Sequence, residues 1–208
     1  MSRIGLFGGT FDPVHYGHLR PALELVEHYA LDTLYLLPNH RPQHRDKPEA
    51  NTQQRIHMLH VAVDDVPQLA IDPREAERNE PTYTIDTLAD VRQENPNATV
   101  IFFMGMDAFA HFDSWHRWEE ILSLTNLVVM DRPDAILSEF AKSLIERQIS
   151  AVGDTIEHNT CGVIERCEVT QIAISATDVR QRVSAGQSIQ FLLPESVREY
   201  IHEQQLYR

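Results

Sequence analysis

Short apolar runs alternate along the chain with segments of helical periodicity, and this alternation restricts the possible folds more than any other feature. The clearest runs lie at 4–7, 34–37, 100–104 and 127–130. The run at 100–104 is apolar at every position, as expected of a central strand in a parallel sheet that is covered on both faces. We therefore predict an α/β fold with a Rossmann-like, doubly wound, mainly parallel sheet and helices on both faces.

Further elements follow from periodicity and capping residues. We expect additional strands at 69–71 and 172–174, and helices over 19–29, 51–63, 81–94, 118–124, 136–149, 175–186 and from 192 onwards. The second helix should turn Ile56, Leu59, His60 and Val63 inward. Residues 150–166 are polar and lack a clear period, which predicts a loop or hairpin. With 208 residues, one domain spanning 1–208 is the default.

The charge balance limits the partners. The formal net charge is −13, so the chain as a whole should repel nucleic acid and anionic membrane surfaces. No apolar run approaches a membrane-spanning length. The two cysteines, Cys161 and Cys167, are too few for a disulfide scaffold, which favours a reducing cytoplasm. Any phosphate ligand must then be held by a local site, and the sequence makes no prediction of the oligomeric state.

The first apolar run leads into a glycine turn and then a helix. Gly8 and Gly9 let the backbone approach a ligand closely, and the free N–H groups at the following helix start favour an anion. His15 and His18 are three residues apart, so they should project from one face of that helix near its first turn. An imidazole there, either protonated or neutral and donating a hydrogen bond, can stabilise charge that develops on a phosphoryl group.

Polar residues also follow three other predicted strands, and ligands of open α/β sheets bind at these carboxyl ends. Residues 40–47 form a basic island in an acidic chain. Gly105 and Asp107 follow the most apolar run, where a carboxylate can accept ribose hydroxyls. Ser175 and Asp178 form a capping box, which accounts for these two residues but leaves Arg180 unused.

Several of these stretches resemble known family signatures. Gly8-Gly9-Thr10-Phe11-Asp12-Pro13 followed by His15-x-Gly17-His18 resembles the hallmark of the nucleotidylyltransferase superfamily. Pro42-Gln43-His44-Arg45, Gly105-x-Asp107 with Ser114-Trp115, and Ile174-Ser175-x-Thr177-x-Val179-Arg180 resemble motifs of nicotinate-nucleotide adenylyltransferases. Gln43 and His116 depart from that pattern, in which proline and tyrosine are common. The likeness extends over nearly the whole chain.

The resemblance implies transfer of the adenylyl group of ATP to nicotinate mononucleotide (NaMN), with Mg²⁺ arriving on ATP and no protein metal site. It implies catalytic roles for His15, His18, Arg45 and Arg180. It implies an ATP site of Gly8, Gly9, Thr10, Phe11, His15, His18, Gly105, Asp107, Ile174, Ser175, Thr177 and Arg180. It implies a NaMN site of Asn39, His44, Arg45, Tyr83, Thr84, Asp107 and Trp115.

Other functions fit parts of the pattern. A metal-dependent hydrolase could be built on Asp12, His15 and His18, but this explains neither Arg180 nor the basic island. A non-catalytic nucleotide sensor of the same fold would bind ATP without releasing pyrophosphate. Within the enzymes, an adenylyltransferase acting on nicotinamide mononucleotide or phosphopantetheine is the alternative.

Overall fold

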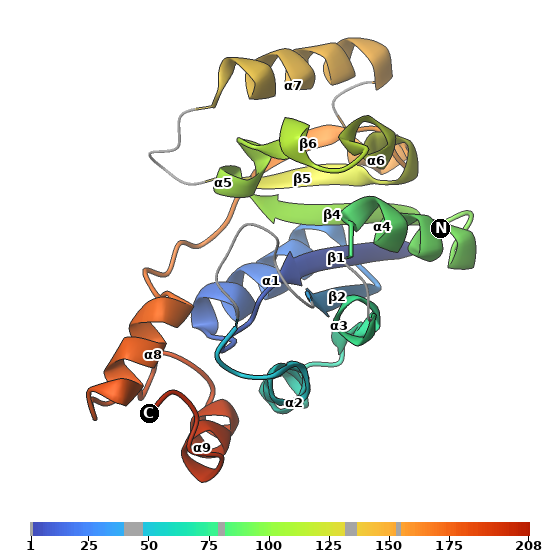
Figure 1. Ribbon diagram of the computed structural model, residues 1–208. Coiled ribbons are helices and arrows are strands. Elements are labelled where there is room, and N and C mark those ends of the chain that lie inside the picture. The colour runs from blue at the N-terminus through green and yellow to red at the C-terminus, as the bar shows by residue number, and fades with distance from the viewer. Residues whose placement is uncertain (1, 40–47, 79–81, 132–136, 153–154) are drawn as a thin grey trace.

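A computed structural model describes residues 2–39, 48–78, 82–131, 137–152 and 155–208. Its strands are β1 (Arg3–Gly9), β2 (Thr33–Pro38), β3 (Leu69–Ile71), β4 (Thr99–Gly105), β5 (Asn126–Asp131) and β6 (Ile164–Glu168). They form a sheet of order β3-β2-β1-β4-β5-β6 in which every neighbouring pair is parallel (Figure 1). The predicted Rossmann-like α/β fold is confirmed.

Helices connect these strands. They are α1 (Tyr16–Tyr29), α2 (Thr52–Val63), α3 (Arg74–Glu77), α4 (Thr84–Glu94), α5 (Met106–Phe109), α6 (Trp118–Leu124), α7 (Glu139–Val152), α8 (Ala176–Ser184) and α9 (Glu195–Glu203). Two short 3-10 turns lie at Phe112–Ser114 and Ile156–His158. The first helix begins at Tyr16, earlier than the expected 19, because His15 already supplies its cap.

Neighbouring residues of the central strands point to opposite faces of the sheet, as the pleat requires. On one face Phe7 and Phe103 join the apolar sides of α1, α2 and α9. On the other face Leu6 and Phe102 join α4, α6 and α7. Both faces are therefore covered, which explains why β4 is apolar at nearly every position.

The last two helices lie at the carboxyl ends of the strands. Figure 1 shows α8 and α9 set apart from the sheet, with the marked C end between them. The α9 helix packs on α2, where the Ser196 hydroxyl donates to the Val61 carbonyl at 2.7 Å. The ring of Tyr200 also lies 4.3 Å from that of His57. This packing brings the segment after α9 towards the glycine turn.

The position of the last strand was predicted wrongly. Residues 172–174 are not a strand; Ile174 N donates to the Ile172 carbonyl at 2.7 Å in a local turn as the chain leaves the sheet for α8. The strand is β6, which begins at 164, near the end of the stretch 150–166 that was expected to be a loop or hairpin, and continues to 168. Its Ile164 and Cys167 are buried in the two opposite cores, with charged residues between them.

The prediction for His60 was also wrong, because this side chain is exposed. Its place on the inward face of α2 is taken by Met58, Ala62 and the fully buried Arg55. The inward positions of Ile56, Leu59 and Val63 are confirmed. The helix therefore presents a guanidinium to the interior next to its apolar residues.

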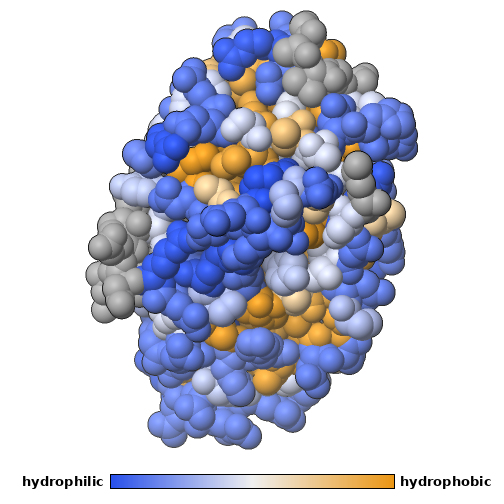
Figure 2. Space-filling view, turned by 90° about the vertical axis from the view of Figure 1, so that its right-hand side faces the viewer, coloured by the Kyte–Doolittle hydropathy of each residue, from blue (hydrophilic) through white to orange (hydrophobic). Residues whose placement is uncertain are grey.

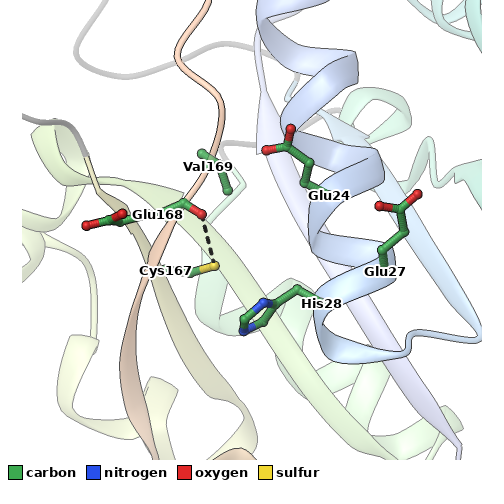
Figure 3. A pocket seen from close by; sticks show the side chains of 6 residues that line it. All are labelled: Glu24, Glu27, His28, Cys167, Glu168 and Val169. Atoms are coloured by element: carbon green, nitrogen blue, oxygen red, sulfur yellow. Dashed lines mark hydrogen bonds between the residues drawn. The ribbon is translucent and has the colours of Figure 1, made fainter.

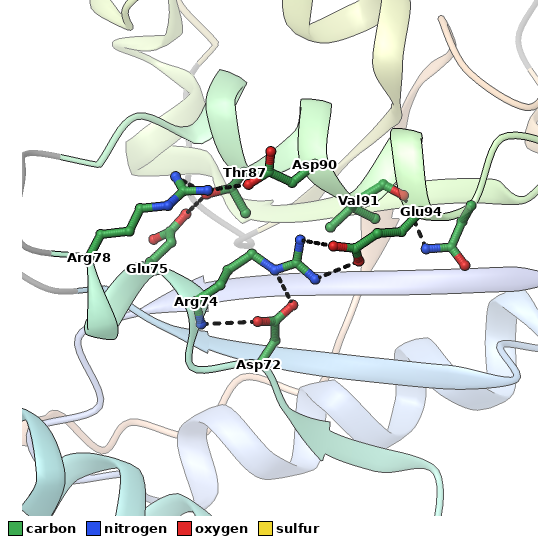
Figure 4. A network of polar contacts seen from close by, with 9 residues as sticks. Asp72, Arg74, Glu75, Arg78, Thr87, Asp90, Val91 and Glu94 are labelled. Atoms are coloured by element: carbon green, nitrogen blue, oxygen red, sulfur yellow. Dashed lines mark hydrogen bonds and ion pairs between the residues drawn. The ribbon is translucent and has the colours of Figure 1, made fainter.

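A polar network ties α3 to α4 (Figure 4). The Arg74 guanidinium donates to Asp72 at 2.7 Å and to Glu94 at 2.9 Å. The Thr87 hydroxyl donates to Glu75 at 2.8 Å, and Arg78 pairs with Asp90. These contacts hold α3 against the middle and the C-terminal end of α4.

Over the described ranges, no helix is long and apolar enough to cross a membrane. Figure 2 shows the side of the molecule on the right of Figure 1, where the N-terminus lies. Its apolar surface is divided into separate patches by hydrophilic side chains. This view thus shows no single broad apolar face.

Candidate active site

The topology places two of the predicted glycine turns side by side. The strand order reverses between β1 and β4, where Phe7 is paired with Phe103, so Gly9 and Gly105 end neighbouring strands. Open α/β sheets bind ligands outside such a switch point. A Cβ added to Gly105 would meet no atom of the described residues within 4 Å, so the space beyond β4 is clear.

The turn after β1 is held in an unusual conformation. Phe11 has a positive φ of 49°, which is uncommon for a residue with a side chain, and its ring is fully buried. A Cβ on Gly9 would lie 2.7 Å from that ring. The Asp12–Pro13 peptide bond is cis. Glycine at position 9 is therefore required because the Phe11 ring folds back over it.

The two histidines of the motif face each other. His15 is the N-cap of α1 and His18 is its N3 residue, with stacked rings whose centroids lie 3.8 Å apart. The His15 backbone N–H donates to His18 Nδ1 at 3.4 Å. Because Nδ1 of a neutral imidazole then acts as the acceptor, Nε2 of His18 carries the proton. The pair presents its donor at the N-terminus of a helix.

Burial controls the charge of His15. The side chain is only 4 % exposed, and this desolvation lowers the pKa of His15 from 6.5 to about 4. Its Nδ1 atom is buried and has no hydrogen-bond partner within the described part of the chain. The sequence allows either a protonated imidazole or a neutral one that donates a hydrogen bond. The lowered pKa makes His15 the neutral imidazole near pH 7.

Gly17 joins the histidine pair to the later part of the chain. A Cβ at this position would lie 2.9 Å from His15 Nδ1 and 3.2 Å from the Ile174 carbonyl oxygen. The segment leading into α8 therefore passes directly over the motif. The site therefore combines residues that are more than 150 positions apart in the sequence.

The predicted cap of α8 is confirmed. The Ser175 hydroxyl accepts a hydrogen bond from Asp178 N at 3.1 Å, and Thr177 is exposed in the first turn. The capping box does not account for Arg180, but this side chain has structural contacts of its own. Its Nε pairs with Glu49 at 2.7 Å, and Nη1 donates to the Asp12 carbonyl at 2.8 Å.

Two buried groups beneath the site were missed by the sequence analysis. Arg55 of α2 is 1 % exposed and donates to the Thr10 and Asn39 carbonyls at 2.7 and 2.8 Å, which joins the ends of β1 and β2. The Tyr207 hydroxyl donates to Asp12 at 2.7 Å. Helical spacing gave one signal for Arg55, since Met58, Leu59 and Ala62 share its face.

The residues expected at the NaMN side lie on short elements near the surface. Asp107 is exposed in the first turn of α5, and Tyr83 caps α4 just before Thr84. The Tyr83 and His116 rings lie in a tilted arrangement with centroids 4.3 Å apart, so the residue that departs from the family pattern still makes an aromatic contact. Trp115 is half-buried against Phe102 and Phe112, at 6.2 and 5.6 Å.

The basic island is not placed relative to these groups. His44 and Arg45 lie outside the described residues, as does Pro81 before Tyr83. Asn39, just before the island, is described, and its backbone N–H donates to the Gly9 carbonyl at 3.0 Å. Its Oδ1 is buried without a partner among the described residues.

The structure also contains a hollow of about 410 Å³ between α1 and β6 (Figure 3). It is lined by Glu24, Glu27, His28, Cys167, Glu168 and Val169. Three carboxylates would repel a phosphate ligand. In the described ranges no group of three or more His, Cys, Asp or Glu side chains could hold a metal ion.

A family model described as cytidylyltransferase-like matches residues 6–182. The chain belongs to the cytidylyltransferase-like family of proteins. Its relatives allow a narrower placement, among the nicotinate-nucleotide adenylyltransferases. This confirms the family that the sequence motifs predict.

The relatives match over almost their full length. A "probable nicotinate-nucleotide adenylyltransferase" of Cellvibrio japonicus is 45% identical and covers 99% of this chain and 98% of its own. A protein of the same name from Pseudomonas aeruginosa is 46% identical, covering 99% and 97%. The Plasmodium falciparum nicotinic acid mononucleotide adenylyltransferase complexed with NaAD has a TM-score of 0.75 at 17% identity, covering 100% of this chain and 98% of that one. That last likeness shows the fold.

Proposed function

We propose that the protein transfers the adenylyl group of ATP to NaMN and releases pyrophosphate, which forms nicotinate adenine dinucleotide for NAD biosynthesis. The observation that carries this proposal is the stacked His15–His18 pair at the N-terminus of α1, beside the β1/β4 switch point and under the Ile174 segment. The names of relatives at 45–46% identity support the same reaction.

The chemistry suits this site. An oxygen of the NaMN phosphate attacks the α-phosphorus of ATP, and the bond from that phosphorus to the bridging oxygen of pyrophosphate breaks. A phosphate monoester has a second pKa near 6 and is largely ionised at pH 7, so no general base is required. Catalysis then depends on aligning two anions and stabilising the charge that moves to the leaving group.

We assign the donors for the phosphates to residues that already point at this place. His18 offers its Nε2 proton, and neutral His15 and the N-terminus of α1 act beside it. Thr10, Thr177 and Arg180 are proposed to complete the ATP side, and the family resemblance assigns a role at the reacting phosphates to Arg45, which lies outside the described residues. Mg²⁺ is part of the MgATP substrate, since it prefers phosphate oxygens and water to an all-protein cage.

One observation argues against the hydrolase alternative. The Asp12 carboxylate is 3 % exposed and accepts hydrogen bonds from Glu49 N, Ala50 N and the Tyr207 hydroxyl. It is therefore used for structure and is not available as a ligand beside His15 and His18. For the cell compartment we propose the cytoplasm, since both cysteines are free thiols; we expect no nucleic-acid or membrane partner.

For the acceptor we propose that the protein prefers NaMN to nicotinamide mononucleotide. The start of α4 at Tyr83 and Thr84 faces the His116 side of the site, and its backbone N–H groups are all donors. A pyridine carboxylate offers only acceptors to them, whereas a carboxamide brings two N–H donors and no charge. Partly unpaired donors cost on the order of 1–3 kcal/mol, enough for about tenfold selectivity or more.

The test is a pyrophosphate-release assay with saturating MgATP and each candidate acceptor: NaMN, nicotinamide mononucleotide and phosphopantetheine. We expect kcat/KM for NaMN to exceed that for the amide by about tenfold or more. A preference for the amide or for phosphopantetheine would favour the alternative transferases. ATP binding without pyrophosphate release would favour a nucleotide sensor.

A further inference from the structure

The segment after α9 contacts the buried side of the turn that follows β1. Tyr207 is 7 % exposed, and its hydroxyl donates to Asp12 Oδ1 at 2.7 Å across 195 positions of sequence. Its backbone φ is 62°, in the left-handed region that non-glycine residues enter at a cost. Because this conformation is unfavourable by itself, the bond to Asp12 and the packing of the ring must hold it in place.

Asp12 also forms hydrogen bonds with two other segments of the chain. Its carboxylate also accepts from Glu49 N at 2.8 Å and Ala50 N at 3.1 Å, which fixes the approach to α2. Its backbone carbonyl accepts from Arg180 at 2.8 Å. The Glu49 side chain binds the same guanidinium at 2.7 Å. Both acceptors that orient Arg180 are therefore attached to the segments that Asp12 joins.

We propose that Tyr207 is a positioning residue for the ATP side of the site: its hydroxyl holds Asp12, and Asp12 and Glu49 set the direction of the Arg180 guanidinium. This inference rests on the proposed function. Tyr207 touches no substrate in this account. Its effect reaches ATP through Arg180 and through the glycine turn, which ends at Asp12.

The geometry predicts which substrate is affected. Arg180 belongs to the ATP side and Asp12 to the glycine turn beside it, whereas Tyr83, Thr84 and Trp115 belong only to the expected NaMN side, on α4 and the segment after β4. A small displacement of a phosphate-binding group weakens alignment strongly, up to about 10²-fold for 1 Å. Loss of the Tyr207 hydroxyl should thus change the use of ATP and leave NaMN binding nearly unaltered.

The test variant is Tyr207→Phe, which keeps the ring and its packing. Asp12 retains two backbone donors, so the variant should fold. Tyr200→Phe is the matched control, because Tyr200 is a tyrosine of α9 whose ring contacts that of His57. We expect Tyr207→Phe to raise KM for ATP about tenfold and to change KM for NaMN less than about twofold. The control should behave as the wild type.

Two outcomes would overturn the proposal: unchanged KM for ATP in Tyr207→Phe, or an equal rise of both KM values, which a merely structural role would produce. A combination with Arg180→Lys tests the route. If both changes act through one contact, the double variant should lose less than the product of the single losses. If the loss in the double variant equalled the product of the two single losses, the route through Arg180 would be contradicted.

Calorimetry with a non-hydrolysable ATP analogue separates this inference from the proposed reaction. We expect Tyr207→Phe to weaken analogue binding about tenfold relative to the wild type and to Tyr200→Phe. If the wild type released no pyrophosphate from ATP and NaMN, the proposed function would fail while this difference in binding would still support Tyr207. Equal binding by all three proteins would overturn the role of Tyr207 alone.

Discussion

The two sides of the candidate site are built differently. On the ATP side Asp12 and His15 are buried, and hydrogen bonds from Arg55 and Tyr207 tie the turn to distant segments. On the expected NaMN side Tyr83 and His116 are exposed, as is Asp107, which both sites are expected to share, and all three lie on short elements or at helix ends. The comparison indicates that the phosphate-binding part is formed in advance, whereas contacts to the acceptor depend on surface groups.

The largest expected effect is on the buried guanidinium beneath the ATP side. Arg55→Met removes two charge-assisted hydrogen bonds and leaves the Thr10 and Asn39 carbonyls without their donor. We expect the free energy of unfolding to fall by about 3 kcal/mol, measured by urea denaturation. The control is Arg20→Met, which removes a surface ion pair with Glu24. This change should lower the free energy of unfolding by about 0.5 kcal/mol or less. If both variants lost a similar free energy of unfolding, the buried hydrogen bonds of Arg55 would be no more important than a surface ion pair.

The next effect concerns the donor that faces the phosphates. His18→Ala should keep the fold and lower kcat by about 10²-fold or more, as removal of a preorganised donor does. Steady-state kinetics at saturating MgATP and NaMN measure this, with the exposed His28→Ala of the same helix as control. Near-normal turnover would show that the stacked pair has no catalytic role.

The neutral state of His15 predicts a pH dependence of stability. Its pKa is lowered to about 4 in the folded protein, so between pH 6.5 and 4 the unfolded chain binds a proton that the folded chain does not. The free energy of unfolding should therefore fall as the pH decreases through this window, by up to about 3 kcal/mol from this residue. Denaturation of His15→Gln at several pH values should lack this part of the slope, whereas His60→Gln should keep it. Parallel curves for the wild type and His15→Gln would contradict the assignment.

The smallest effect is expected on the exposed side. His116→Tyr restores the common family residue and keeps a ring against Tyr83. An aromatic pair is worth roughly 1 kcal/mol, and the pair is retained, so KM for NaMN should change about twofold or less. The matched change Tyr200→Phe, away from the site, should alter neither KM. A tenfold change in KM for NaMN with His116→Tyr would show that the geometry of this side matters as much as that of the ATP side.

Sequence patterns were sufficient for the central sheet, because β1, β2, β4 and β5 are apolar on both faces. They failed at β6, an edge strand in which Glu165, Arg166 and Glu168 interrupt the apolar period. The apolar run at 172–174 was misleading, since it reflects partial packing of Ile174 against the core.

The candidate site was predicted where its residues follow strand ends, as Gly9, His15 and Asp107 do. Arg55 and Tyr207 were missed because their partners are single carbonyl or carboxylate oxygens on distant segments, and no local period records such contacts. The contacts of Arg180 were missed for the same reason. Long-range hydrogen bonds of this kind depend on the tertiary arrangement, which a single sequence does not specify.

The bond between Asp12 and Tyr207 also has a consequence for how the molecule folds. Closing a loop of 195 positions carries an entropic cost that only the assembled sheet and helices can offset. During synthesis the sheet neighbours β1 and β2 can pair early, whereas the turn after β1 must wait for the segment beyond α9. We therefore expect nucleotide binding to appear late in refolding, after most helical signal has returned.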